Sequence, residues 1–501
     1  MTIPACDLLI IGGGINGCAI AREAALLGQK VLLVERDDLA GHTSSASSKL
    51  IHGGIRYLEY HDFRLVAEAL RERGRLMRAG PHLIHPLRFV LPHDDAVRPW
   101  WMVRLGLLLY DLLGGRMTLP RARGLRRGDT AWRAALKGFA RGGGRGFVYS
   151  DTCVDDSRLT LANAIDAAAN GATIRTHVAF AGARRADGAW LATIAGENGT
   201  EQVRARALVN AAGPWVMEAL GRAGGRAAAG VRLVKGSHIV VPRLYDGDHA
   251  YILQQPDRRI VFAIPWQGMT AIGTTDIPVS RPEDAGIDAA EIAYLCAAAN
   301  RYFIRQIAPG DVRHSWSGVR PLYDDGASEA RAVTRDYVLD MDGADGAPPL
   351  LSVFGGKITT ARHLAEAAMR RLAAPLGITA RPVTRDRAFP GGDMADFAAF
   401  VAQARARWPF LGAARADRMA RAYGSLLATM LDHVEDEAGM GEAFGGGLTA
   451  LELAWMRDRE WARDANDALD RRSKLGLALD PAQRARVAAW FAQGRSMNSD
   501  G

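Results

Sequence analysis

The clearest chemical signal lies in three glycines near the N-terminus and one glutamate. Gly12, Gly14 and Gly17 form a G-x-G-x-x-G motif, and Glu35 follows at the distance typical of dinucleotide sites. Glycines at this spacing permit a tight turn and let a pyrophosphate approach the N-terminus of a helix, where free N–H groups and the positive end of the dipole stabilise it. A carboxylate at position 35 can accept hydrogen bonds from a ribose hydroxyl. The motif therefore predicts a bound dinucleotide.

Such a motif needs a strand before it and a helix after it, and the neighbouring sequence predicts both. Residues 8–11 and 31–34 are short apolar runs typical of buried strands, and residues 16–27 carry apolar side chains at helical spacing. Together they predict a βαβ unit with parallel strands. A later strand, two glycines and a helix start at residues 350–360 offer a second helix N-terminus for a flavin ring. Because no second dinucleotide motif follows, this context favours FAD over NAD.

The composition excludes several classes of protein. The 501 residues contain 48% hydrophobic and 24% charged residues, values typical of a globular protein rather than a disordered, collagen-like or disulfide-rich one. The four cysteines lie far apart in the sequence, so we expect no cysteine-based zinc site and no dithiol centre, and a reducing compartment fits. We find no metal-ligand spacing. The absence of G-x-S-x-G leaves a serine hydrolase without support.

Positive charge is concentrated in one segment of the chain. Residues 98–145 hold eleven basic and two acidic residues, a net charge of +9, against +8 for the whole chain. Arginines beside apolar and aromatic side chains are typical of a monotopic membrane surface, although a solvated basic surface would account for the charge as well. The apolar candidates are Trp100, Trp101, Leu107, Leu108, Leu109, Leu112 and Leu113. With no signal peptide and no run of about 18 apolar residues, we expect peripheral attachment rather than a spanning segment.

Longer strings carry a family resemblance over nearly all of residues 7–366. DRRSKLGL, at residues 470–477, adds a match near the C-terminus, whereas residues 394–469 match less well. On these strings the chain resembles the FAD-dependent glycerol-3-phosphate dehydrogenases that feed the respiratory quinone pool. The main strings are IIGGGINGCAIAREAA, TSSASSKLIHGGIRYLE, PHLIHPLRFVLP, GLLLYDLLGG, YSDTCVDDSRLTLANA, LVNAAGPWV, VKGSHIVVP, IGTTD, SGVRPLYDD and LLSVFGGKITTARHLAE.

The resemblance implies a fold of three parts. The first is an α/β FAD-binding domain, Rossmann-like and of the glutathione-reductase or D-amino-acid-oxidase type, built from residues 1–80, 146–230 and 330–380. The second is a mostly antiparallel substrate and membrane-facing domain of residues 81–145 and 231–329. The third is a helical C-terminal domain of residues 390–501.

It also implies which residues bind the ligands. Cations that converge on one site fit a phosphomonoester dianion, because arginine donates forked hydrogen bonds to its oxygens. The expected substrate residues are Arg56, Tyr57, Arg320, Arg335, Lys357 and Thr359. The expected FAD residues are Gly12, Gly14, Ile15, Asn16, Gly17, Glu35, Thr43, Ser44, Ser45, Ser48, Lys49, Leu50, His52, Gly53, Val178, Ala211, Gly213, Trp215, Gly355, Gly356, Lys357, Ile358 and Thr359.

The implied reaction is the oxidation of sn-glycerol 3-phosphate to dihydroxyacetone phosphate, with a hydride passing to flavin N5 and electrons to a membrane quinone. Three residues are catalytic candidates. His238 is a candidate base with a pKa near the working pH, and Arg320 and Lys357 are candidates for stabilising negative charge on oxygen. The identity of the base stays open at this point.

Three alternatives stay open: a glycerol-3-phosphate oxidase that uses oxygen, an amine or amino-acid oxidase of similar fold, and a non-catalytic flavoprotein that docks through its arginines. For the favoured reading we expect a peripheral enzyme on the cytoplasmic face of the inner membrane. It would contact anionic phospholipid and not nucleic acid. The oligomeric state is open, with a homodimer as one option.

Overall fold

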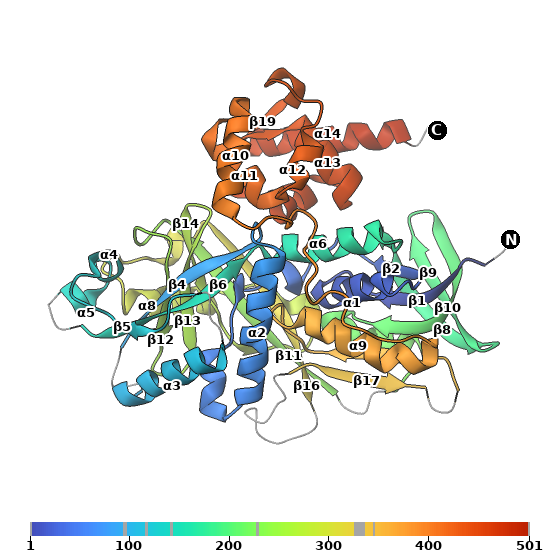
Figure 1. Ribbon diagram of the computed structural model, residues 1–501, viewed down its shortest axis with the longest axis horizontal. Helices are drawn as coiled ribbons and strands as arrows, with labels where there is room; N and C mark the ends of the chain where they lie inside the picture. Colours follow the sequence, from blue (N-terminus) through green and yellow to red (C-terminus); the bar gives the residue numbers. More distant parts are fainter. Residues whose placement is uncertain are drawn as a thin grey trace.

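Two large β-sheets and a group of C-terminal helices make up the chain (Figure 1). The computed structural model describes residues 3–93, 98–115, 119–140, 144–226, 230–324, 336–343 and 346–498.

The first sheet holds the glycine motif. Its strands run in the order β17-β18-β10-β1-β2-β7, and β8 and β9 extend it as an antiparallel hairpin beside β10. The central pairs, from β18 through β7, are parallel. The strands are β1 (Ala5–Ile11), β2 (Val31–Glu35), β7 (Thr173–Thr176), β8 (Ala179–Ala186), β9 (Ala189–Gly196), β10 (Gly199–Asn210), β17 (Val338–Asp342) and β18 (Leu350–Phe354).

Both faces of this sheet are covered, which explains the continuous apolar runs in its central strands. Leu8 and Ile10 of β1 belong to a core shared with α1 (Ile15–Leu26), α6 (Asp156–Ala169) and α9 (Ala361–Leu376). Leu9 and Ile11 belong to a second core, which includes residues of β8, β9 and α7 (Val216–Arg222). The sheet therefore has a fixed position between two apolar layers.

The second sheet is antiparallel except for one parallel pair, β4 with β12. Its order is β15-β11-β14-β13-β12-β4-β6-β3, with β16 beside β11 and β5 beside β6. One of its cores includes residues of α8 (Ala289–Asn300), and another includes α2 (Phe63–Ala79) and α3 (Trp100–Leu113). The strands are β3 (Leu50–Ile51), β4 (Ile84–Pro92), β5 (Arg123–Gly124), β6 (Gly146–Val154), β11 (Gly230–Val241), β12 (Ala250–Gln254), β13 (Ile260–Trp266), β14 (Met269–Gly273), β15 (Ile277–Pro278) and β16 (His314–Asp324). The short helices α4 (Thr130–Arg133) and α5 (Lys137–Ala140) lie in the basic segment.

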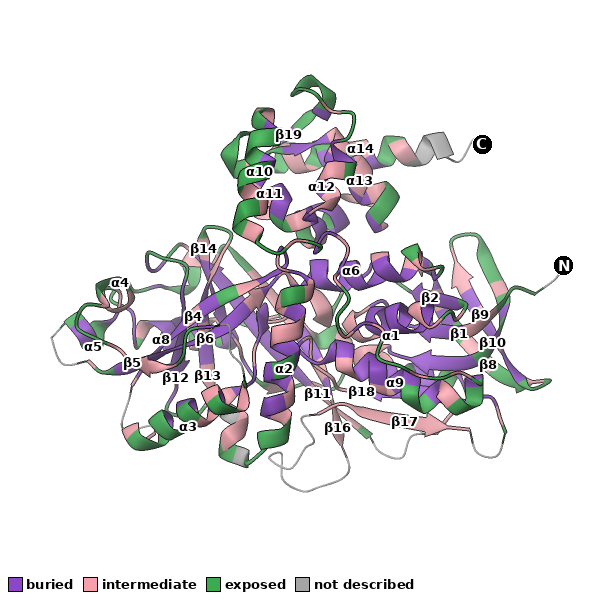
Figure 2. Cartoon of the chain, viewed as in Figure 1, coloured by how far each residue is buried: buried purple, intermediate pink, exposed green. Residues whose placement is uncertain are grey.

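The C-terminal helices form a separate core above the two sheets in the view of Figure 1. Figure 2 shows that their outer sides are largely exposed, while the sheet strands are mostly buried. They are α10 (Phe397–Arg407), α11 (Gly412–Tyr423), α12 (Leu426–Met430), α13 (Ala450–Glu460) and α14 (Pro481–Asn498), with a small hairpin of β19 (Ala443–Gly445) and β20 (Leu448–Thr449).

This architecture confirms the predicted fold class: a Rossmann-like α/β part, an antiparallel sheet and C-terminal helices. One detail differs from the predicted boundaries. The predicted FAD domain includes β3 and β6, yet both strands pair in the second sheet, where β6 lies between β3 and β4. Apolar runs alone could not reveal this, because they do not specify the partner strand. The boundaries otherwise stay a prediction.

Candidate cofactor and substrate site

The glycine turn between β1 and α1 leaves no room for larger residues. A Cβ atom on Gly17 would lie 1.9 Å from the carbonyl oxygen of Gly12. Gly12 has φ +110°, and a Cβ there would lie 2.5 Å from the carbonyl oxygen of Ala211. Close backbone approach at both positions therefore requires glycine. The N-terminus of α1 is thereby held against the end of β10.

Glu35 is fixed beside this turn by two backbone donors. Its carboxylate accepts hydrogen bonds from the N–H of Gly13 at 2.6 Å and from the N–H of Asp37 at 2.9 Å. Burial is the main influence on this group and raises the pKa of the Glu35 carboxyl, which the two N–H donors oppose. Val178 donates its N–H to the Glu35 carbonyl at 2.8 Å, which brings the predicted residue 178 to the same place.

A cavity of about 130 Å³ opens beside the turn. Two polar groups at the start of α1 are relevant: Ser44 Oγ accepts the N–H of Ile15 at 2.9 Å, and Asn16 Oδ1 is buried without a hydrogen-bond partner among the described residues. A narrow glycine-lined space next to an acidic side chain suits the ADP half of FAD. The predicted residues that line it are Gly12, Gly14, Glu35, Thr43, Ser44, Ala211, Gly213 and Trp215. The lining residues that were not predicted are Ile11, Val34, Arg36, Ala40, Gly41, His42, Ala179, Phe180, Ala212, Pro214, Glu218, Ala219 and Arg222.

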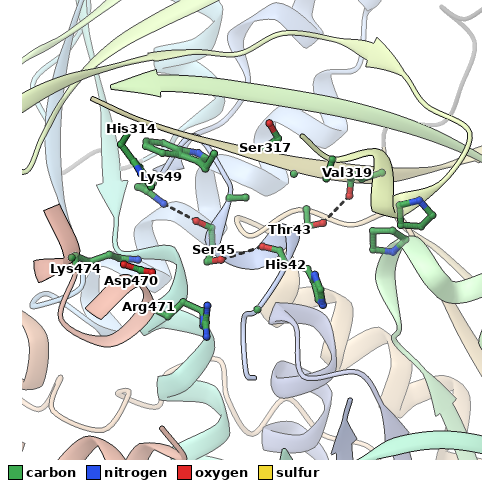
Figure 3. A pocket seen from close by; sticks show the side chains of 18 of the residues that line it. His42, Thr43, Ser45, Lys49, His314, Ser317, Val319, Asp470, Arg471 and Lys474 are labelled. Atoms are coloured by element: carbon green, nitrogen blue, oxygen red, sulfur yellow. Dashed lines mark hydrogen bonds between the residues drawn. The ribbon is translucent and has the colours of Figure 1, made fainter. Parts of the chain in front are cut away.

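A larger cavity of about 350 Å³ meets the first at His42, Thr43 and Trp215 (Figure 3). The predicted residues Ser45 and Lys49 line it. Lys49 Nζ pairs with Asp156 at 3.0 Å, and burial lowers the pKa of Lys49. Residues of β16 form another part of its lining, and the C-terminal residues Asp470, Arg471 and Lys474 form a third. These three residues were not predicted to line a site, although they belong to the string DRRSKLGL.

The late Gly-Gly segment lies against the N-terminal motif, as the sequence predicted. Gly355 and Gly356 have φ values of +71° and +91°. Asn16 Nδ2 donates to the carbonyl of Gly355 at 3.1 Å, and a Cβ on Gly356 would lie 2.8 Å from the same Nδ2. Two segments more than 300 residues apart therefore meet at the start of α1. Ile358 packs in a core that also contacts Ile15, and Thr359 is buried.

Lys357 and Tyr57, both predicted to bind the substrate, lie together. Lys357 Nζ lies 4.0 Å from the centre of the Tyr57 ring, a cation–π contact that brings the two predicted substrate residues together. Arg56 belongs to the same 3₁₀ turn, Ile55–Tyr60, but its side chain is outside the described part of the chain. Arg335 also falls outside the described residues.

Arg320 and His238 lie on the paired strands β16 and β11, above two glycines. A Cβ on Gly236 would lie 3.2 Å from Arg320 Nη2, and a Cβ on Gly273 would lie 2.1 Å from His238 Cδ2. These glycines let both long side chains lie flat across the sheet. Arg320 Nη2 pairs with Asp276 at 2.8 Å. Asp276 is the last residue of the string IGTTD and was not predicted to belong to the site.

His238 is buried and neutral. Burial is the main cause that lowers its pKa to about 3, and the nearby Lys49 and Arg320 add to the effect. A pKa near the working pH, as the sequence analysis expected, is therefore wrong for this structure. The ring stacks on Trp316 with centroids 5.1 Å apart, and its Nε2 lies 2.9 Å from Ser48 Oγ. Nδ1 has no hydrogen-bond partner among the described residues.

The segment that connects the cofactor and substrate ends is buried and hydrogen-bonded. Leu50 belongs to β3, and His52 Nδ1 accepts the N–H of Gly54 at 3.1 Å. Burial is the main cause that lowers the pKa of His52. The N–H of Gly53 donates to the hydroxyl of Tyr110 at 2.7 Å.

The apolar residues of the basic segment divide between two faces of α3. Leu107 is fully buried, so its expected place on a membrane surface is wrong, whereas Trp100 stacks on Phe147 with centroids 3.9 Å apart and is half-buried. The helical repeat turns Leu107 inward. Leu109 and Leu113 are half-buried. The exposed apolar side chains are Trp101, Met102, Leu105, Leu108 and Leu112.

One group of potential metal ligands exists among the described residues, although the sequence predicted none. Ligand atoms of Glu35, Asp37 and His42 lie within 4.8 Å of one another. His42 Nε2 pairs with Asp37 at 2.8 Å, and Glu35 already accepts two backbone N–H groups. Their hydrogen bonds therefore account for the grouping.

Comparisons with known proteins agree with this geometry. The sequence model of the family described as FAD dependent oxidoreductase matches residues 7–362. The chain is 49% identical to a glycerol-3-phosphate dehydrogenase of Pseudomonas aeruginosa, over 97% of this chain and 94% of that protein. It is 48% identical to a D-erythritol 1-phosphate dehydrogenase of Brucella abortus, over 97% of both. A solved structure of the glycerol-3-phosphate dehydrogenase from Bacillus halodurans complexed with FAD is similar, with 25% identity and a TM-score of 0.74, over 98% of this chain and 94% of that one.

Proposed function

This chain belongs to the FAD-dependent oxidoreductase family, and we propose that it oxidises sn-glycerol 3-phosphate to dihydroxyacetone phosphate. The observation that carries the proposal is the 49% identity to a glycerol-3-phosphate dehydrogenase along 97% of the chain. The similarity therefore includes both ends of the site and the C-terminal helices.

The residues of the site have roles that suit this reaction. When bound, FAD supplies the two-electron acceptor. Arg320 binds the phosphate of the substrate, and Lys357 stabilises negative charge on the oxygen of the carbon to be oxidised. In the tautomer whose Nε2–H donates to Ser48, His238 Nδ1 accepts a hydrogen bond from the substrate hydroxyl, while burial, which lowers its pKa to about 3, opposes full protonation of the ring. Arg56 and Arg335 complete the phosphate site in this proposal.

Anaerobic addition of glycerol 3-phosphate tests the activity. The bound flavin should bleach, and a quinone should restore its colour faster than oxygen. Fast reoxidation by oxygen with peroxide release would favour the oxidase. Bleaching by amino acids or amines instead would favour that class, and no bleaching by any of them would contradict the proposal.

A second substrate comes from the 48% identical relative named D-erythritol 1-phosphate dehydrogenase. Erythritol phosphate is one hydroxymethylene longer, so it would present the same phosphate group and the same alcohol carbon to the same cations. Comparison of kcat/KM for the two polyol phosphates decides which is the better substrate.

We further propose that α3 docks on an anionic phospholipid surface, from which a quinone reaches the enzyme. None of the helices among the described residues is long and apolar enough to cross a membrane. Trp101 and Leu112 are 67% and 65% exposed, and Arg104 lies exposed on the same helix. An apolar face beside cations suits the headgroup boundary. A location on the cytoplasmic face of the inner membrane and a homodimer stay predictions.

Flotation with phosphatidylglycerol vesicles tests this docking. Changing Trp101, Leu105, Leu108 and Leu112 to serine should abolish flotation and leave activity with a water-soluble acceptor intact. Leu107→Ala is the matched control from the buried face of α3: it should lower the thermal midpoint and leave flotation unchanged. Failure of the wild type to float would contradict the proposal.

A further inference from the structure

We infer that Tyr110 is a positioning residue, which holds the backbone of Gly53 and thereby the segment that carries His52, Arg56 and Tyr57 in its substrate-binding shape. The inference rests on the proposed function, because that proposal assigns this segment to the substrate.

The Tyr110 hydroxyl makes two hydrogen bonds in a fully buried place. It accepts the N–H of Gly53 at 2.7 Å and donates to Asp151 at 2.7 Å. Asp151 also pairs with Arg73 at 2.6 Å, and Arg73 donates to the carbonyl of Ser150 at 3.1 Å. The phenol is therefore the link between one backbone N–H and a buried ion pair.

Gly53 packs closely against Tyr110, and the direction of their hydrogen bond is fixed. A Cβ on Gly53 would lie 2.7 Å from the Tyr110 hydroxyl and 2.6 Å from Leu70 Cδ2. Burial is the main cause that raises the pKa of Tyr110, and the carboxylate of Asp151 adds to it. The hydroxyl therefore keeps its proton for Asp151, and its oxygen is left to accept from Gly53.

The consequence lies in the residues next to Gly53. On one side, His52 accepts the N–H of Gly54. On the other, the turn Ile55–Tyr60 brings the Tyr57 ring to 4.0 Å from Lys357 Nζ. A buried N–H that loses its acceptor is unfavourable, so without the phenol oxygen this segment must shift to satisfy it. Tyr110 acts through this segment and does not itself belong to the proposed substrate site.

The position of Tyr110 on α3 connects the substrate segment to the helix that carries the proposed docking face. Val103, Leu107 and Tyr110 form the buried face of this helix, whereas Leu105, Leu108 and Leu112 are exposed on the other. A single helix therefore carries the proposed docking face on one side and the anchor of the substrate segment on the other.

Tyr110→Phe tests the inference, because it removes only the hydroxyl. The matched control is Tyr251→Phe, which removes a buried tyrosine hydroxyl whose hydrogen bond goes to the Trp132 carbonyl at 3.0 Å, in another core. Tyr110→Phe should raise KM for glycerol 3-phosphate about tenfold and change kcat by no more than about twofold, with normal FAD content. Tyr251→Phe should leave KM unchanged. A wild-type KM in Tyr110→Phe, or equal losses in both variants, would overturn the inference.

Hydrogen exchange gives a readout that needs no substrate. Peptides that contain the Gly53 amide should exchange at least about tenfold faster in Tyr110→Phe than in the wild type, and at the wild-type rate in Tyr251→Phe. Unchanged exchange would overturn the inference even if KM changed. If glycerol 3-phosphate fails to bleach the wild-type flavin, the proposed function fails, while exchange still decides whether Tyr110 holds this segment.

Discussion

The dinucleotide end and the substrate end of the site are built in opposite ways. At the dinucleotide end, one continuous stretch from β1 to β2 supplies the turn, the helix N-terminus and Glu35, and backbone atoms set the distances. At the proposed substrate end, separate segments each supply one or two side chains: Tyr57 from a 3₁₀ turn, His238 from β11, Arg320 from β16 and Lys357 after β18. The first end takes its turn and its acidic residue from one stretch of chain, against which Ala211 and Gly355 also pack, whereas the second depends on how two sheets pack.

The electrostatics differ in the same way. Glu35 is buried and already held by two backbone donors. Arg320 is 43% exposed and pairs with Asp276, which is 54% exposed. An exposed pair of this kind contributes little to stability and can exchange its carboxylate for a phosphate. Substitutions at the dinucleotide end should therefore affect cofactor content and folding, and substitution of the exposed Arg320 should affect kinetics alone.

The largest effect is expected for Gly17→Ala. The new Cβ would lie 1.9 Å from the carbonyl oxygen of Gly12, so the turn must move. Overpacking of this kind costs about 1–3 kcal/mol or more. The purified variant should hold almost no FAD and should melt at a lower temperature. Gly221→Ala, in helix α7 with no atom within 4 Å of the new Cβ, is the control and should retain both. Normal flavin content in Gly17→Ala would contradict this account of the turn.

Arg320→Ala should lower kcat/KM by roughly 10²-fold, since a charge-assisted hydrogen bond is worth about 1.5–3 kcal/mol and strengthens in the transition state. FAD content and the thermal midpoint should stay at wild-type values. The control is Arg232→Ala, which removes an arginine of the same strand pair whose partner is Asp324 at 3.4 Å. Equal kinetic losses in the two variants would show that Arg320 supports the sheet rather than the substrate.

Glu35→Gln should weaken FAD binding about tenfold. The amide presents N–H donors where the Gly13 N–H now donates, so one charge-assisted hydrogen bond is lost, a change of about 1.5–3 kcal/mol of which the amide oxygen recovers part. Fluorescence titration of the apoprotein with FAD measures the change, and kcat at saturating FAD should be unaffected. A fall in kcat with normal FAD affinity would contradict the assignment of Glu35 to cofactor binding alone.

The same contrast explains what the sequence could predict. Gly12, Glu35 and the βαβ unit were predictable, because the spacing of the glycines in the sequence determines the shape of the turn. The strand, two glycines and helix start of residues 350–360 were also predicted, but the contact of Asn16 with Gly355 was not. Three features could not be predicted, because each depends on partners far away in the sequence: the pairing of β6 in the second sheet, the burial of Leu107 and the contribution of Arg471 to the larger cavity. The pKa of His238 likewise depends on burial that no local pattern reveals.

The smallest effect is expected for the ionisation of His238. Its pKa of about 3 lies below the ordinary value of 6.5, so the folded protein binds fewer protons there than the unfolded chain between these two pH values. This difference lowers stability as the pH falls from about 6.5 towards 3 and has no effect above about 7. His238→Gln should therefore reduce the loss of thermal midpoint between pH 7.5 and pH 5, and it should lower kcat by up to about tenfold, because the hydrogen bond to the substrate hydroxyl is weakened. The kcat profile of the wild type should show no ionisation of this residue between pH 6 and 8. A break in that range that disappears in His238→Gln would show that substrate and flavin restore an ordinary pKa to the ring.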